Sequence, residues 1–286
     1  MIKQVLGVEV IIQGVKVALI DNETNLIVPG TTIVRKDVDA RGSADHLFGN
    51  WTDAINECLQ LNSGIATHIG MAMPGQLEFE DGISYIQNQN KFDAIYGLNV
   101  RDLISEKTNI PSENIKIQNN SMAFMAGEVI LGAVKGYQRP LCFTLDSGFG
   151  TARYINEKII DANLWEAPFK DGIAEDYLGI RWFAKRYHEF TGHQITNIKE
   201  LSTLADTDDG IGQIVFNEYS ENFVNFLIHD IKLHNTDLVL IGGHDEVWDR
   251  YIPHVKDRLS DKRLLIPIKQ AVNTDTATLI GAANIW

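Results

Sequence analysis

Residues 141–160, LCFTLDSGFGTARYINEKII, form the stretch that decides the expected fold. An apolar run leads into a glycine-punctuated turn and an apolar return, which predicts a strand, a turn and a second strand. Gly148 and Gly150 let backbone N–H groups approach an anion closely, and Ser147 and Thr151 add hydroxyl donors, as in a phosphate-binding loop. An ordinary hairpin loop with two turn glycines is the alternative, and this segment alone favours it.

The same order of strand, turn, strand and turn occurs near the beginning of the chain. Residues 4–12 and 14–21 predict two strands rich in Val and Ile, followed by the turn residues 21–25 and an apolar strand at 26–29. Two copies of one supersecondary unit, about 130 residues apart, indicate two related lobes rather than a solenoid. A cleft between two such hairpins would suit a nucleotide.

Length and composition fit an ordinary protein of two domains. The 286 residues suit two domains of about 100 to 150 residues each. There are 38 acidic and 25 basic residues, and the net charge of -13 argues against binding to nucleic acid or to an anionic membrane. Cys58 and Cys142 lie far apart without metal-ligand spacing, which argues against a zinc site and fits a reducing cytoplasm. We expect no signal peptide, because residues 1–4 lead directly into a strand-like pattern, and no membrane helix, since no apolar run approaches the ~18 residues required.

Hydrophobic periodicity predicts the other elements of the chain. Helices are expected at residues 43–61, 100–105, 122–131, 175–190, 198–205, 213–234 and 276–285. Further strands are expected at residues 68–73, 82–85, 115–118, 238–241 and 264–268.

Three polar or glycine-rich segments between these elements each have two interpretations. The Asn-Asn-Ser run at 119–121 caps the following helix, or it faces a ligand at the edge of an open α/β sheet. The amide run at 87–90 pairs with sugar hydroxyls, or it is a solvated loop. Gly242 and Gly243 follow a buried strand and allow close backbone approach, either to a ligand or to another element.

Taken together in this order, the segments resemble the ROK family of sugar kinases and related repressors. The matching segments are residues 7–21 (first phosphate hairpin), 71–75 (strand and Pro-Gly), Asn90 (sugar loop), 119–128 (family pattern NDANAAALGE), 145–152 (family pattern LGTGIGGG), 175–178, 241–244 (family pattern IGGG) and 279–283. The matches span essentially the whole chain.

The resemblance implies an α/β protein with the actin-like ATPase (ribonuclease H-like) fold. It would have two lobes with a duplicated β-hairpin unit and a cleft between them. The expected N-terminal lobe comprises residues 1–118 plus 273–286, and the C-terminal lobe comprises residues 119–272. The Gly14-Val15-Lys16 run is most similar to the polyphosphate/ATP-glucokinase-like branch, which lacks the zinc cysteines of most relatives, so no zinc or other protein-bound metal is expected. A homodimer is implied, and without a DNA-binding extension the chain resembles the kinases.

The resemblance also assigns roles to residues of this chain. Asn120 takes the position of the family's catalytic Asp, the general base that accepts the proton of the sugar hydroxyl. The implied substrate-binding residues are Asn90, Asn119 and Glu166. The implied nucleotide- and phosphate-binding residues are Glu9, Gln13, Ser147, Gly148, Gly150, Gly242 and Gly243.

Several of these positions depart from the family pattern. An amide at Asn120 holds a hydroxyl but cannot accept its proton, and loss of a positioned base typically costs ~10² to 10⁴ in rate. Ile11 and Ile12 replace two glycines, which closes the first phosphate loop. Asp146 replaces a glycine and brings a negative charge near the expected phosphate. Phe169 stands where the family has a sugar-binding His.

Three functional hypotheses follow from this pattern. The first is a carbohydrate kinase homologue, hexokinase- or glucokinase-like, with weak or absent transfer from ATP and Mg²⁺ to glucose or an N-acetylhexosamine. The second is a catalytically silent sensor or regulator that binds a sugar or a protein partner. The third is a structural oligomer without a small ligand. All three place the protein in the cytoplasm, and the first two give it a small sugar or a partner.

Overall fold

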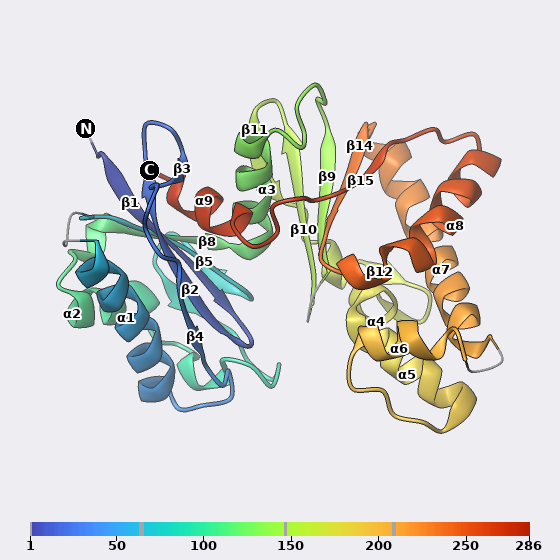
Figure 1. Cartoon of the computed structure of the whole chain (residues 1–286), viewed down its shortest axis with the longest axis horizontal. Coiled ribbons are helices and arrows are strands. Elements are labelled where there is room, and N and C mark those ends of the chain that lie inside the picture. The colour runs from blue at the N-terminus through green and yellow to red at the C-terminus, as the bar shows by residue number, and fades with distance from the viewer. Residues whose placement is uncertain (1, 63–65, 146–147, 208–209) are drawn as a thin grey trace. The chain divides into compact units, whose positions relative to one another are not determined.

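A computed structural model describes residues 2–62, 66–145, 148–207 and 210–286 (Figure 1). The chain divides into two compact units: unit 1 is Met1–Gly132 with Asn273–Trp286, and unit 2 is Ala133–Val272. The boundary that we expected at residues 118/119 differs from this division. Unit 1 extends to Gly132 because helix α3 (Asn120–Leu131) packs along helix α9 (Ala277–Ala283), which lies in the same unit.

Unit 1 is built on one mixed sheet with the order β3-β2-β1-β5-β8, and β4 also pairs with β2. Its strands are β1 (Gln4–Ile11), β2 (Gly14–Asp21), β3 (Leu26–Ile27), β4 (Val34–Asp37), β5 (Ile69–Met73) and β8 (Ile115–Asn119). Strands β1 and β2 form an antiparallel hairpin, whereas β1, β5 and β8 run parallel. A second, two-stranded sheet pairs β6 (Leu77–Glu78) with β7 (Ile83–Ser84).

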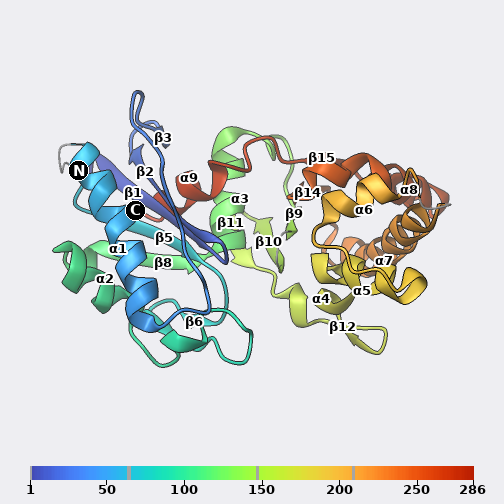
Figure 2. The same cartoon turned by 60° about the horizontal axis from the view of Figure 1, so that its bottom comes forward.

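Helices cover both faces of the unit 1 sheet (Figure 1, Figure 2). Helix α1 (Ala44–Leu61) begins at the N-cap Ser43, whose hydroxyl accepts the His46 N–H at 3.2 Å, and its apolar face buries Trp51 against the sheet. Helix α2 (Val100–Thr108) packs beside α1, and α9 crosses β1 and β5 with α3 alongside it.

Unit 2 repeats the topology of unit 1. Its sheet has the order β11-β10-β9-β14-β15, formed by β9 (Pro140–Leu145), β10 (Phe149–Ile155), β11 (Lys158–Asp161), β14 (Leu238–Gly242) and β15 (Ile268–Gln270). Strands β9 and β10 form the hairpin, and β9, β14 and β15 run parallel. Each unit therefore has a hairpin, a third antiparallel strand and two added parallel strands, which confirms the duplication expected from the sequence.

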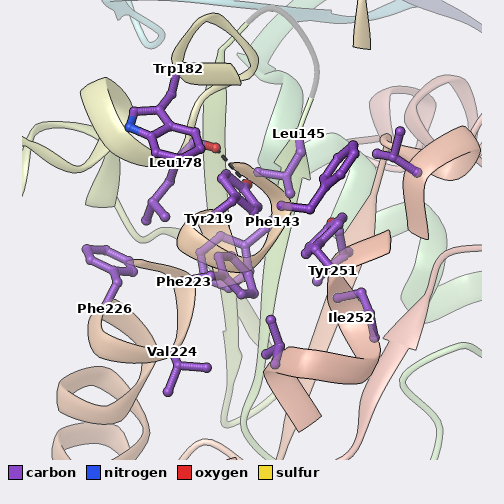
Figure 3. Close-up of a cluster of buried hydrophobic side chains, with 14 of the residues drawn as sticks. Phe143, Leu145, Leu178, Trp182, Tyr219, Phe223, Val224, Phe226, Tyr251 and Ile252 are labelled. Atoms are coloured by element: carbon purple, nitrogen blue, oxygen red, sulfur yellow. Dashed lines mark hydrogen bonds between the residues drawn. The ribbon is translucent and has the colours of Figure 1, made fainter. Parts of the chain in front are cut away.

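Helices gather over one face of the unit 2 sheet (Figure 1). They are α4 (Ala174–Leu178), α5 (Ile180–Thr191), α6 (Ile198–Leu204), α7 (Ile211–His234) and α8 (Trp248–Asp261). A two-stranded sheet pairs β12 (Pro168–Phe169) with β13 (Gly172–Ile173). Figure 3 shows the aromatic core beneath these helices, where the Tyr219 hydroxyl donates to the Leu178 carbonyl oxygen at 2.9 Å.

Two element predictions need correction, and one helix was missed. The single helix expected at 175–190 is two helices, because Gly179 adopts an extended conformation (φ -77°, ψ 158°) between α4 and α5. The strand expected at 264–268 begins only at Ile268, because Pro267 has no N–H to donate to a sheet. Helix α8 was not expected, and it contains Pro253 within its first turns.

Candidate functional site

The loop between β8 and α3 shows why Asn119 begins a helix. Its Oδ1 accepts the Ser121 backbone N–H and the Ser121 hydroxyl, both at 2.8 Å. Asn119 is therefore the N-cap of α3, as the capping interpretation predicted. Since Oδ1 is used in this way, the amide nitrogen is the group that Asn119 would offer to a sugar hydroxyl.

Asn120 connects the first turn of α3 to strand β1. Its Nδ2 donates to the Val10 carbonyl oxygen at 2.9 Å. Its Oδ1 is buried and has no hydrogen-bond partner among the described residues. The side chain thus fixes the helix start against the hairpin, and it presents an amide where the resemblance implied a carboxylate.

The tip of the β1–β2 hairpin folds against the body of unit 1. Ile11 pairs with Gly14, so the turn consists of Ile12 and Gln13. Ile12 is half-buried and packs on the core under α1, while the exposed Gln13 accepts the Val38 N–H on its carbonyl oxygen at 3.1 Å. An apolar side chain consequently occupies the tip at which glycine was expected in the family.

Glu9 lies in a group of charged side chains near the tip of the same hairpin, in the third residue pair from the turn. The Lys16 Nζ is 3.1 Å from a Glu9 carboxylate oxygen and 3.3 Å from Asp275 Oδ1. Arg35 forms a second ion pair with Asp275, and the Thr278 hydroxyl bonds to Glu9. Burial lowers the pKa of Lys16, but the two carboxylates more than offset it, so the pKa lies above its ordinary value and the ammonium stays charged.

The amide run at 87–90 is a surface loop. Asn90 is exposed and adopts a left-handed backbone conformation (φ 55°), as does Asn88 (φ 60°). The loop is anchored by Phe92, a fully buried residue whose N–H donates to the Ala40 carbonyl oxygen at 2.6 Å. Among the described residues no contact brings Asn90 to the start of α3, so its role in sugar binding stays a prediction.

In unit 2 the β9–β10 hairpin carries the second predicted phosphate loop. Ser147 and Asp146 lie outside the described residues. Gly150 pairs with Thr144 within the hairpin. Beside Gly148, the Phe149 N–H donates to a carboxylate oxygen of Glu175 at 3.4 Å, and Arg181 binds the other oxygen of that carboxylate.

Glu166 lies in a short 3-10 helix, Leu164–Glu166, that is joined to β10 by a hydrogen bond of 3.0 Å from Leu164 N–H to Thr151 Oγ1. Glu166 is exposed and accepts from the Asn163 amide, and Asn163 Oδ1 accepts the Trp165 indole N–H at 2.7 Å. This local network orders the carboxylate without burying it, so it is accessible to a ligand.

Phe169, which stands where the resemblance implied a His, packs edge-on against Tyr177 and Phe226 with ring centroids 5.5 and 5.7 Å apart. Its ring belongs to the aromatic core of unit 2 and offers no polar group.

Gly242 ends strand β14 next to β9, and Gly243 follows it directly. A Cβ on Gly243 would lie 2.0 Å from the Leu145 carbonyl oxygen, and its φ is 85°, so close packing alone requires glycine there. His244 follows with its ring buried among Phe183, Tyr219 and Tyr251. Burial lowers its pKa to about 3, which keeps the imidazole neutral.

The structure brings together part of the predicted site within each unit. In unit 1, Asn120 is tied to β1 beside Glu9, with Asn119 capping the same helix. In unit 2, Gly242 and Gly243 lie against the strand that leads to Gly148. The sequence did not identify three residues that contact the predicted site residues or their neighbours. They are Lys16 and Asp275 in unit 1, and Glu175 in unit 2. Lys16 had a signal, because a two-residue turn at 12–13 places residues 9 and 16 opposite each other.

Glu128 lies in α3, and its side chain is a buried carboxyl group with little hydrogen bonding. It is fully buried, and neither carboxylate oxygen has a hydrogen-bond partner by geometry in the described part of the chain. Burial raises its pKa, and the Asn273 backbone N–H opposes that rise only in part. Ionisation of Glu128 is therefore disfavoured in the folded protein.

We expect Glu128→Gln to stabilise the protein at neutral pH. Because the folded pKa is raised, the folded state is penalised as pH rises above the unfolded value near 4.5, and the substitution removes this cost. Urea unfolding at pH 7 should show a gain of about 1 to 3 kcal/mol, and the gain should shrink toward pH 4.5. Glu106→Gln, at an exposed position of α2, is the control and should change little; an equal gain at both pH values would contradict the assignment.

The described residues contain neither a candidate membrane-spanning helix nor a candidate cluster of metal ligands. Within them, no helix is both long and apolar enough to cross a membrane. The same residues contain no group of three or more His, Cys, Asp or Glu side chains able to hold a metal ion.

The chain matches the sequence profile of one known protein family. A sequence profile described as the ROK family matches residues 16–163, just over half of the chain. A search of curated protein sequences finds no match.

Solved structures share the fold over nearly the whole chain. A ROK family glucokinase from Streptomyces griseus, in complex with glucose and AMPPNP, has 18% identity and a TM-score of 0.74, with 99% of this chain and 98% of that chain covered. An inorganic polyphosphate/ATP-glucomannokinase from an Arthrobacter strain has 18% identity and a TM-score of 0.73, with coverage of 98% and 96%. A ROK family transcriptional regulator, homologous to the E. coli MLC protein, has 15% identity and a TM-score of 0.77, with coverage of 99% and 77%. The expected actin-like ATPase fold is thereby confirmed.

Proposed function

This chain belongs to the ROK family, and on that premise we propose that it is a sugar-kinase homologue whose phosphoryl transfer is weak or absent. The observation that carries the proposal is the hydrogen bond of 2.9 Å from Asn120 Nδ2 to the Val10 carbonyl oxygen. A general base must accept the proton of the attacking hydroxyl, and an amide engaged as a donor does not. Asn120 then acts as a structural tie between α3 and β1.

The hairpin beside Asn120 supports the same proposal. A phosphate loop needs backbone N–H groups that an anion can approach, which glycine permits. Here Ile12 packs on the unit 1 core and Gln13 continues the turn, so the tip is built by side-chain packing. Loss of the base and loss of the phosphate loop together reduce transfer more than either loss alone.

We propose a hexose, such as glucose or an N-acetylhexosamine, as the ligand. The S. griseus relative was solved with glucose and AMPPNP, which supports a sugar and ATP as the ligands to test. Asn90, Asn119 and Glu166 are the proposed sugar contacts, and Gly148, Gly150, Gly242 and Gly243 the proposed nucleotide contacts. Family membership further suggests a cytoplasmic homodimer without zinc.

A coupled assay with glucose, N-acetylglucosamine or N-acetylmannosamine and ATP·Mg or polyphosphate tests the proposal. Turnover should be lower by at least about 10² to 10⁴, the cost of the missing base alone, than that of a family kinase with an Asp base assayed in parallel. At least one sugar should nevertheless raise the melting temperature, since Glu166 remains accessible. Turnover at the rate of the reference kinase would overturn the proposal.

Asn120→Asp is the matched variant for this assay. It places a carboxylate oxygen against the Val10 carbonyl oxygen and removes the hydrogen bond, so it should lower the free energy of unfolding by about 1 to 3 kcal/mol. Turnover should recover only in part, because a carboxylate is restored but the hairpin tip is unchanged. A large rise in turnover would instead show that the missing base is the sole defect.

A regulatory protein without kinase activity is the second candidate. Its support is the packed hairpin tip at Ile12, together with the fold shared with a ROK transcriptional regulator. Calorimetry separates the two candidates: sugar binding without nucleotide binding supports the regulator, whereas tight binding of ATP·Mg favours the weak kinase.

A further inference from the structure

In unit 1 the Lys16 ammonium lies between two carboxylates. Its Nζ lies 3.1 Å from Glu9 on the neighbouring strand and 3.3 Å from Asp275 just before α9. The side chains of Lys16 and Glu9 are 19% and 10% exposed, so their contact is largely shielded from water, whereas the side chain of Asp275 is 61% exposed. Such an arrangement of two carboxylates around a central positive charge is also one that a divalent metal ion adopts.

The surroundings of Glu9 do not fit a Mg²⁺ ion. Mg²⁺ requires near-octahedral oxygen ligands and retains several waters, whereas the space between Glu9 and Asp275 contains the Lys16 ammonium. Arg35 adds a second cation on Asp275, so two positive charges already balance the two carboxylates. A divalent ion would therefore meet a neutralised group and be repelled by Lys16.

We propose that the Lys16 ammonium takes the place of a divalent cation in this chain, so that the protein does not bind Mg²⁺ at Glu9. The inference rests on the proposed function, because it concerns the same hairpin. It extends that function by making any sugar or nucleotide binding at this hairpin independent of a metal ion.

Mn²⁺ binding, measured by electron paramagnetic resonance without sugar or nucleotide, tests the inference. The wild-type protein and Glu9→Gln should bind Mn²⁺ equally weakly, because Glu9 contributes no metal site. Lys16→Met should increase Mn²⁺ affinity by about tenfold or more, because it removes the ammonium that repels a divalent ion and leaves Glu9 free to bind one. Adding Glu9→Gln to Lys16→Met should abolish the gain, and Lys16→Arg, which keeps the cation, should show none.

Two results would overturn the inference. One is Mn²⁺ binding in the wild type that Glu9→Gln removes; the other is a Lys16→Met protein that remains folded, by near-ultraviolet circular dichroism, and gains no affinity. Should Lys16→Met fail to fold, the comparison of wild type with Glu9→Gln still decides. Sugar turnover without Mn²⁺ binding at Glu9 would contradict only the proposed function, whereas Glu9-dependent Mn²⁺ binding without turnover would contradict only this inference.

Discussion

Gly281→Ala is expected to unfold the protein or to lower its free energy of unfolding by about 3 kcal/mol or more. Gly281 lies in α9, where a Cβ would be 1.7 Å from the Ala123 carbonyl oxygen of α3. The helices are equally close at a second point, since a Cβ on Gly127 would be 1.9 Å from the Ala277 carbonyl oxygen. The obstacles are backbone atoms, so no rotamer change can relieve the overlap.

Helix α9 also has no direction in which to move. On its other side, a Cβ on Gly70 of β5 would lie 1.9 Å from the Ala282 carbonyl oxygen. The sheet and α3 therefore confine the helix from two sides, and interiors packed at this density transmit strain instead of absorbing it.

Guanidinium-chloride unfolding of Gly281→Ala and of Gly49→Ala measures the effect. Gly49 lies inside α1 with open space around its Cα, so alanine there should gain about 0.5 to 1 kcal/mol from helix propensity. A folded Gly281→Ala protein with the wild-type midpoint would show that α9 can shift after all.

The overall fold was easier to predict from the sequence than the exact element boundaries, because the signals for the hairpins are local. Alternating Val and Ile residues and short turns specify β1–β2 and β9–β10 without any knowledge of distant residues. Two element boundaries that were predicted wrongly could also have been found from the sequence. Gly179 interrupts a helical pattern and Pro267 precedes a strand. Both residues act through their own backbone.

The site was less predictable because its contacts join distant parts of the chain. The Asn119 cap follows from neighbouring residues, but the Asn120 hydrogen bond reaches Val10 across 110 positions. The two partners of Lys16 also differ in how predictable they are. The hairpin register implies Glu9, whereas Asp275 is close to Lys16 only because α9 packs on the sheet. Packing of α9 on the sheet, which no local pattern encodes, decides the charge balance at Glu9.

Asp230→Ala is expected to lower the free energy of unfolding by about 3 to 5 kcal/mol, because it leaves a buried guanidinium without its partner. Arg153 of β10 and Asp230 of α7 are each 5% exposed. Both guanidinium nitrogens of the fork donate to the carboxylate, with Nη1 to Oδ1 at 3.0 Å, and Thr236 Oγ1 donates to the same Oδ1 at 3.2 Å. A bidentate, largely dehydrated pair of this kind is much more costly to break than a surface pair.

The double variant Arg153→Met, Asp230→Leu separates the cost of a lone charge from the value of the pair. Apolar side chains of similar volume fill the space between β10 and α7, so most of the loss should be recovered, as replacement of buried ion pairs often allows. Arg258→Ala, which breaks the exposed ion pair with Glu221, is the control and should cost no more than about 1 kcal/mol. If Asp230→Ala cost no more than that control, water would be reaching Arg153, and the helix α7 would be held to the sheet by its aromatic core alone.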